Sequence, residues 1–225
     1  MKNFKLLEDD TISVDGHTLY RIEATRDFAN VNCGDIGGYV ESPDNLGDEA
    51  WVFGNARVYG NARVFEKAQV SENALVCGNA WVYENARVYE NARVCGRARV
   101  YGRASVYGEA RVCGDGLVFG NALVLGTAMV CGDAWVYGDS RILKGSVKGA
   151  RDVINITSNG VLYLITILPH HIQIGCQCHT RTAWFNFTDE EIRAMDGEKA
   201  VVWWKTWKPI LKSICDANAS GDEQC

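Results

Sequence analysis

The chain has 225 residues, of which 47% are hydrophobic, and a formal net charge of −5. This length and apolar content predict a folded protein with one sizeable core and a small accessory unit, and they argue against a disordered chain. The mild negative charge argues against a general nucleic-acid-binding protein and against a membrane-surface protein, because both depend on a strong basic excess.

The first residues, MKNFKLLEDDTISV, contain neither the apolar run of a signal peptide nor a membrane-spanning segment. We therefore expect a cytoplasmic protein with no membrane partner. In that compartment the nine cysteines are expected to be reduced, mostly buried small residues, and not a disulfide framework.

A valine or a similar residue recurs every six residues through the middle of the chain, at 17 positions from Leu46 to Ile142. Strand side chains alternate between two sides, whereas a helix would spread this period around its surface, so the repeat predicts short strands. Alanine two residues before nearly every valine shares the inward side, and Gly or Asn at the turns tolerates positive φ. Three sides of six residues close into an 18-residue coil, as in a parallel β-helix.

Four cysteines test this coil independently. Cys77, Cys95, Cys113 and Cys131 follow one another at intervals of one full coil, so we expect them to stack in one outward column. Tyr59 continues the column one coil earlier, so the position accepts a bulky side chain and does not demand sulfur. We interpret the column as a shallow strip against which something packs, without thiol chemistry.

The repeat resembles that of hexapeptide-repeat, left-handed β-helix proteins, and its handedness is implied by this resemblance. The segment DGHTLYRIEATRDFANVNCGDIGGYVE, which contains His17, further resembles a bacterial and prophage subgroup labelled as transferases without a demonstrated reaction. The resemblance covers roughly the first two-thirds of the chain, and it indicates fold more strongly than function. Since hexapeptide rods usually form trimers, it also implies a homotrimer.

We expect a mainly β protein with three regions. Residues 1–45 cap the β-helix, residues 46–146 form about five to six triangular coils of hexapeptide repeats, and residues 147–225 form a small α+β domain. In the last region DVINIT, VLYLITIL and HIQIGCQCHT predict strands. Thr188 and Glu191 predict a capping box, and EKAVVWWKTWKPILKSI predicts a Trp-rich helix that Pro209 kinks or divides. The final DANASGDEQC is expected to fray.

Histidine, the usual general base of hexapeptide acyltransferases, is scarce here: none lies between His17 and His170, and no long loop interrupts the coils. An acyltransferase that uses acetyl-coenzyme A stays open as an alternative, with His17, His170 or His179 as its base. The repeat lacks the three histidines of the zinc hydratases, and Cys176, Cys178 and His179 would converge poorly from one strand. We therefore expect no catalytic residue, metal or cofactor.

Arginines are concentrated in the middle of the repeat, at Arg87, Arg93, Arg97, Arg99, Arg103 and Arg111. Guanidinium groups suit phosphate, and outward tyrosines can stack on a base. We predict that a small phosphorylated anion binds to Arg93, Arg99, Arg111, Tyr101 and Tyr107. The alternative is a solvated ladder of ion pairs with Glu84, Glu90 and Glu109. The arginines fall on all three sides of the coil, so they converge only if subunits bring their sides together.

One side of the coil collects aromatic residues when outward positions are grouped coil by coil. A monomer rarely leaves so large an apolar patch exposed. We predict an oligomer interface there, with the tryptophans of the C-terminal helix as the alternative cover. The predicted interface residues are Phe65, Trp81, Tyr83, Phe119, Trp135 and Tyr137.

These features predict a non-enzymatic, oligomeric binding protein, encoded by a phage or prophage, that sequesters a small phosphorylated ligand such as a signalling nucleotide in counter-defence. One alternative is the acyltransferase described above. The other is a scaffold or inhibitor that binds a host protein.

Overall fold

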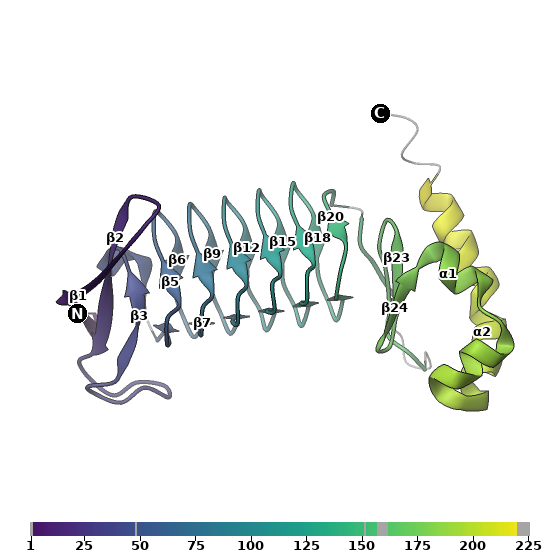
Figure 1. The fold of residues 1–225 in the computed structure, drawn as a ribbon, viewed down its shortest axis with the longest axis horizontal. Coiled ribbons are helices and arrows are strands. Elements are labelled where there is room, and N and C mark those ends of the chain that lie inside the picture. Colours follow the sequence, from purple (N-terminus) through teal and green to yellow (C-terminus); the bar gives the residue numbers. More distant parts are fainter. Residues whose placement is uncertain (1, 48, 151, 157–161, 220–225) are drawn as a thin grey trace. The chain divides into compact units, whose positions relative to one another are not determined.

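The computed structural model of the chain describes residues 2–47, 49–150, 152–156 and 162–219. The chain divides into two compact units, Met1–Asn155 and Ile156–Cys225. The first unit is a series of stacked β coils behind an N-terminal β meander, and the second combines a small sheet with helices (Figure 1). In the part of the chain that the structure describes, no helix is both long and apolar enough to cross a membrane.

The N-terminal meander extends one side of the coils. Strands β1 (Phe4–Val14), β2 (His17–Ala24) and β3 (Ile36–Val40) pair antiparallel, and the short helix η1 (Pro43–Asn45) follows. β3 then runs parallel to the first coil strand beside it. Gly38 permits this close approach, because a Cβ there would lie 2.5 Å from the carbonyl oxygen of Ala56.

Three parallel sheets form the sides of the solenoid. The first continues from β3 through β5 (Arg57–Val58), β8 (Leu75–Val76), β11 (Arg93–Val94), β14 (Arg111–Val112), β17 (Met129–Val130) and β20 (Ser146–Val147). The second contains β6 (Arg63–Val64), β9 (Trp81–Val82), β12 (Arg99–Val100), β15 (Leu117–Val118) and β18 (Trp135–Val136). The third contains β4 (Trp51–Val52), β7 (Gln69–Val70), β10 (Arg87–Val88), β13 (Ser105–Val106), β16 (Leu123–Val124) and β19 (Arg141–Ile142). We name their outward surfaces the cysteine face, the aromatic face and the third face.

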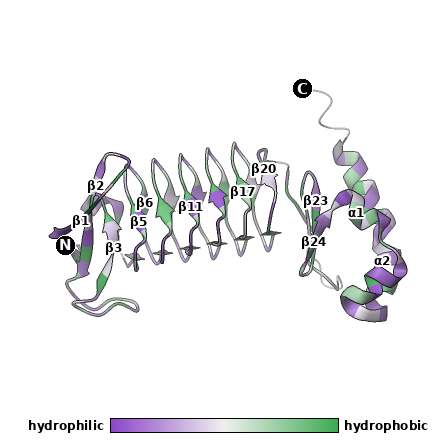
Figure 2. Ribbon diagram, viewed as in Figure 1, coloured by the Kyte–Doolittle hydropathy of each residue, from purple (hydrophilic) through white to green (hydrophobic). Residues whose placement is uncertain are grey.

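The predicted parallel β-solenoid of about six coils is confirmed. The repeated valines and alanines point inward and are buried, while the alternate residues point outward, so apolar and polar residues are interspersed along each coil (Figure 2). Backbone N–H groups donate to the carbonyls of the following coil, as from Cys77 to Val94 and from Cys95 to Val112, both at 2.9 Å. These bonds satisfy the backbone while the narrow Val/Ala core excludes water.

Strand β21 (Ile154–Ile156) spans the boundary between the units. The second unit continues with strands β22 (Ile165–Ile167), β23 (His171–Ile174) and β24 (Gln177–Thr180) and with helices α1 (Arg181–Asn186) and α2 (Asp189–Ala219). Each of the three segments predicted as strands contains at least one strand, and HIQIGCQCHT forms two strands joined by a turn. Thr157 and Val161 of the predicted segments lie outside the described residues. The helix α1 was not predicted, although Thr180 caps it by accepting a 3.1 Å hydrogen bond from the N–H of Ala183.

The predicted capping box at the start of α2 is confirmed, because Thr188 and Glu191 exchange hydrogen bonds of 2.8 and 3.3 Å. Pro209 does not divide the helix, because α2 continues through it to Ala219. The break lies at Asp196–Gly197, where Gly197 has a φ of 72°, a conformation that costs glycine little. Pro209 is exposed, so solvent can bond the carbonyl that it leaves free. Of the segment expected to fray, residues 216–219 continue α2, and residues 220–225 lie outside the described residues.

Candidate functional site

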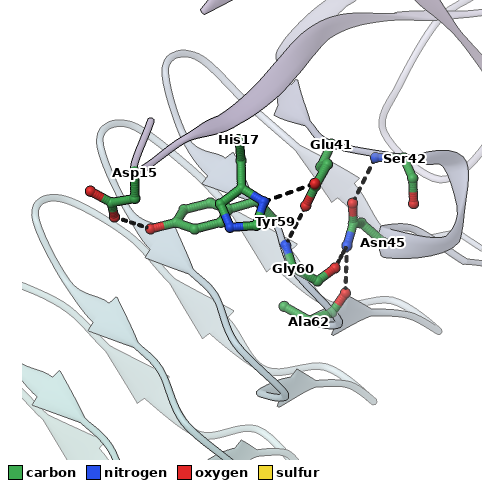
Figure 3. Close-up of polar contacts among 8 residues, drawn as sticks. All are labelled: Asp15, His17, Glu41, Ser42, Asn45, Tyr59, Gly60 and Ala62. Carbon is green, nitrogen blue, oxygen red and sulfur yellow. Dashed lines mark hydrogen bonds and ion pairs between the residues drawn. The ribbon is translucent and has the colours of Figure 1, made fainter. Parts of the chain in front are cut away.

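Polar side chains cover the open edge of the first coil (Figure 3). The carbonyls at this edge have no preceding coil to donate to them, so they need other donors. The amide of Asn45 donates to the carbonyls of Gly60 and Ala62 at 3.0 and 2.9 Å. Its oxygen accepts a 2.8 Å hydrogen bond from the N–H of Ser42. Asn45 therefore fixes the first corner of the solenoid.

A histidine and a carboxylate form a pair beside this cap. His17 begins β2 and Glu41 follows β3, and His17 Nδ1 lies 2.8 Å from Glu41 Oε1. Glu41 Oε2 accepts a 2.6 Å hydrogen bond from the N–H of Gly60. The hydrogen bond with His17 lowers the pKa of Glu41; burial opposes this shift and the bond from Gly60 adds to it. A carboxylate that orients an imidazole in this way can prepare it for general-base chemistry.

Tyr59, which precedes the cysteines in the column, lies beside His17 (Figure 3). Its ring centroid lies 5.0 Å from that of His17, and its hydroxyl donates to Asp15 Oδ2 at 2.7 Å. Burial, with the hydrogen bond to Asp15, raises the pKa of Tyr59. The residues below Tyr59 in the column are free, half-buried cysteines, namely Cys77, Cys95, Cys113 and Cys131.

The aromatic face carries two columns of outward side chains. One contains Phe65, Tyr83, Tyr101, Phe119 and Tyr137, whose rings stack with centroid separations of 4.9, 5.0, 5.1 and 5.9 Å. In the other, on the strands, Arg99 lies over the Trp81 ring at 5.1 Å, and Trp135 is 47% exposed. The six residues predicted as an oligomer interface therefore lie on this one face, which leaves an apolar surface in the single chain.

The five residues predicted to bind a ligand are divided among the three faces of a single chain. Arg93 and Arg111 are register partners on the cysteine face. Arg99 and Tyr101 belong to the aromatic face, and Tyr107 stacks on a tyrosine of the third face. The structure thus does not bring these five together within one chain.

The predicted ladder of arginine–glutamate pairs is not the arrangement that the structure shows. Among the described residues, the arginine in this group with an ion pair is Arg97, which meets Asp115 at 2.7 Å. Arg93 and Arg111 stack as like charges on neighbouring strands, an arrangement that an anion would stabilise.

A hollow of ≈320 Å³ lies at the N-terminal end of the aromatic face. It is lined by Lys2, Asp44, Gly47, Arg63, Val64, Phe65 and Trp81. Two cationic side chains and two aromatic rings thus share one depression. The sequence could not reveal this site, because the position of Lys2 beside Trp81 depends on how the N-terminal meander folds onto the first coils.

The second unit contains an apolar cavity of ≈260 Å³. It is lined by Tyr163, Ile174, Gly175, Cys176, Gln177, Trp184, Ile192, Met195, Asp196, Ala200, Trp203 and Trp204. Within the described residues the indole N–H groups of Trp203 and Trp204 are buried without a hydrogen-bond partner. The Tyr163 hydroxyl donates to Asp196 at 2.7 Å, and burial, with this bond, raises the pKa of Tyr163 to about 12. The cavity is therefore mostly apolar, with one polar corner.

In residues 2–47, 49–150, 152–156 and 162–219, no group of three or more His, Cys, Asp or Glu side chains could hold a metal ion. Cys176 is exposed, whereas Cys178 and His179 are half-buried. Their arrangement gives no support to a metal centre in the CQCH segment.

The stacked parallel coils define a β-helix repeat protein. Four segments of the solenoid, residues 50–66, 56–72, 68–84 and 92–108, match the family model described as YdcK Beta solenoid repeat. No curated protein matches the chain. The match agrees with the observed coils and concerns their fold.

Proposed function

We propose that the protein is a non-enzymatic, homo-oligomeric binding protein that sequesters a small phosphorylated ligand with a planar base, such as a signalling nucleotide. The observation that carries this proposal is the hollow lined by Lys2, Arg63, Phe65 and Trp81. Lysine and arginine suit phosphate oxygens, and aromatic rings stack on a base. The volume of ≈320 Å³ is at the lower end of the range for small-molecule sites, about 300–1,000 Å³.

The proposal extends along the aromatic face to two residues predicted from the sequence. Arg99 lies over the ring of Trp81, so a ligand stacked at Trp81 would be close to a third cation, and Tyr101 is in the neighbouring column. Arg93, Arg111 and Tyr107 lie on other faces and would join the site only through a neighbouring subunit. A homotrimer that covers the aromatic face would supply such a neighbour and would bury its aromatic rings.

The biological context in this proposal rests on the resemblance to hexapeptide-repeat proteins of bacteria and prophages. A phage-encoded, cytoplasmic protein that removes a host signalling nucleotide would need affinity and no catalysis. The stacked like charges of Arg93 and Arg111 and the hollow on the aromatic face support an anionic ligand.

Calorimetry of the full-length protein with a panel of cyclic and linear nucleotides tests the proposal. We expect binding that weakens with salt, and at least about a tenfold loss of affinity in the double variant Lys2→Gln/Arg63→Gln, since each charged contact contributes about 1 kcal/mol or more. Arg97→Gln is the matched control, because Arg97 is paired with Asp115. The proposal fails if no nucleotide binds, or if the control loses as much affinity as the double variant.

A second candidate function is acyl transfer from acetyl-coenzyme A. It is favoured by the pair of His17 and Glu41, which has the geometry of a carboxylate-oriented general base. This candidate predicts that the protein binds acetyl-coenzyme A and that His17→Ala abolishes any transfer, whereas His170→Ala leaves it unchanged. Transfer that survives His17→Ala would exclude His17 as the base.

A further inference from the structure

Two thiols of the cysteine column are in contact. Cys77 follows β8 and Cys95 follows β11, which are neighbouring parallel strands in register. A hydrogen bond joins the two thiols, whose sulfur atoms are 2.9 Å apart. Neighbouring strands lie about 4.7–4.9 Å apart, which is inside the Cα separation of about 4.4–6.8 Å that disulfides span. The backbone therefore already holds these two residues at a distance that a covalent bond can bridge.

The surroundings favour the thiolate of Cys77 over that of its neighbours. The hydrogen bond with Cys95 lowers the pKa of Cys77, burial opposes this shift, and the Arg93 charge adds to the lowering, while the charge of Asp15 acts against it. The same hydrogen bond, with burial, raises the pKa of Cys95. One sulfur is thus prepared to attack, and the other stays protonated beside it.

We infer that Cys77 and Cys95 form an oxidation site at which hydrogen peroxide converts two thiols into a disulfide between successive coils. The Cys77 thiolate attacks one peroxide oxygen, the O–O bond breaks, and hydroxide leaves and takes up a proton, so that a sulfenic acid forms. The Cys95 sulfur then attacks the sulfenic sulfur, the S–O bond breaks, and the leaving oxygen takes the Cys95 proton to form water. Two thiols are oxidised, and one peroxide is reduced to two waters.

Other cysteines of the chain serve as controls for the reactivity of Cys77 and Cys95. Cys113 lies below Cys95 at the same outward position, and burial raises its pKa, which lowers its thiolate fraction. Cys33 and Cys176 are exposed but belong to loops outside the column. A site that depends on the contact between Cys77 and Cys95 must therefore react before Cys113, whose pKa is also raised by a hydrogen bond with Cys131. It must give a disulfide where the exposed Cys33 and Cys176 give only an oxyacid.

The test treats the full-length protein with hydrogen peroxide, blocks remaining thiols with N-ethylmaleimide, and maps tryptic peptides without reduction. Cleavage after Lys67, Arg87, Arg93 and Arg97 places the two cysteines in separate peptides, 68–87 and 94–97. We expect these two peptides joined by a bond that dithiothreitol reverses, formed about tenfold faster than any product at Cys113. The inference would be overturned if other cysteines are oxidised while Cys77 and Cys95 both carry N-ethylmaleimide, because both would then still be reduced thiols.

Variants separate the two chemical steps. In Cys95→Ser we expect Cys77 to accumulate a sulfenic acid that dimedone traps, whereas Cys113→Ser should form the same disulfide at the unchanged rate. If Cys95→Ser gives no trapped product at Cys77, or if Cys113→Ser prevents the disulfide, the assignment is wrong. The wild-type peptide map decides by itself should a variant fail to fold.

Discussion

Glu41 and Gly60 are joined by a 2.6 Å hydrogen bond from the backbone N–H of Gly60 to the Glu41 carboxylate. This contact ties the end of the meander to the turn after β5, while the other carboxylate oxygen meets His17. One side chain thus stabilises the cap and orients an imidazole. Both roles depend on the ionised carboxylate, so a fall in pH that protonates Glu41 should weaken both.

Replacing Glu41 by Gln should reduce stability at neutral pH by about 1 kcal/mol, because a charge-assisted hydrogen bond becomes a neutral one at a partly exposed site. The pKa of Glu41 is lowered in the folded state from an ordinary value of 4.5. Its contribution is therefore present above that value and is lost as the pH falls through the folded-state pKa. Urea unfolding of both proteins from neutral to acidic pH measures this difference.

The control for this experiment is Glu109→Gln, which changes a carboxylate on another turn of the solenoid. Its unfolding curve should follow the wild type at every pH. A stability difference for Glu41→Gln that stays constant down to the lowest pH would contradict the assigned role of the charge.

Gly38→Ala should destabilise the first unit by about 1–3 kcal/mol, because overpacking against backbone cannot be relieved by a side-chain rotation. The added Cβ would lie 2.5 Å from the carbonyl oxygen of Ala56 and 2.6 Å from Cγ1 of Val52. Thermal unfolding followed by circular dichroism would record a lower midpoint.

Gly116→Ala is the matched substitution within a coil. Gly116 occupies the position that Ala98 holds in the preceding coil and Ala134 in the following one, so an alanine there restores the repeat. The added Cβ would be 3.1 Å from its nearest neighbour. We expect an unchanged or slightly higher unfolding midpoint. If Gly38→Ala and Gly116→Ala lower the unfolding midpoint equally, the loss of stability would come from replacing glycine as such and not from the tight contact at Gly38.

Trp135→Glu should weaken the proposed self-association by at least about tenfold, because it places a charge in a surface that would be desolvated in the oligomer. Native mass spectrometry and sedimentation velocity measure the assembly directly. Leu123→Glu, on the third face, is the control and should leave the assembly mass unchanged. An oligomer that withstands Trp135→Glu but dissociates with Leu123→Glu would move the interface to the third face.

Tyr163→Phe should remove one phenol that titrates near pH 12. Burial and the bond to Asp196 raise the pKa of Tyr163 in the folded state, so the stability that it contributes is complete below its ordinary value of about 10 and is lost as the pH rises toward about 12. The difference in phenolate absorbance between the two proteins gives the titration. A midpoint near 10 would show that the cavity leaves this hydroxyl in ordinary solvent.

The sequence predicted the solenoid well because its period is a local property. Every repeat has the same spacing of inward valine and alanine, so the strand, the turn and the coil can each be predicted from this spacing alone. The stacking of the aromatic column, from Phe65 to Tyr137, follows from the same arithmetic. The strand segments of the second unit could also be predicted, from their apolar runs.

Features that depend on contacts outside the period could not be predicted in this way. The hollow at Lys2 and Arg63 requires the path of the meander, and the pair of His17 and Glu41 requires the antiparallel register of β2 and β3. Spacing placed Cys77 above Cys95, but it could not show that their rotamers bring the sulfur atoms together. The helix breaks at Asp196–Gly197 and not at Pro209, because glycine adopts a positive φ at little cost.

The hydrogen bonds from each coil to the next also govern which insertions and deletions the solenoid tolerates. Removing one whole coil would bring Cys131 beneath Cys95 and leave every face with its own kind of residue. Removing a single repeat would keep the valines inward but turn all later coils by one side, so that Phe119 would lie beneath Cys95 in place of Cys113. Length in this protein can therefore change in whole coils, whereas any smaller change exchanges the identities of its three faces.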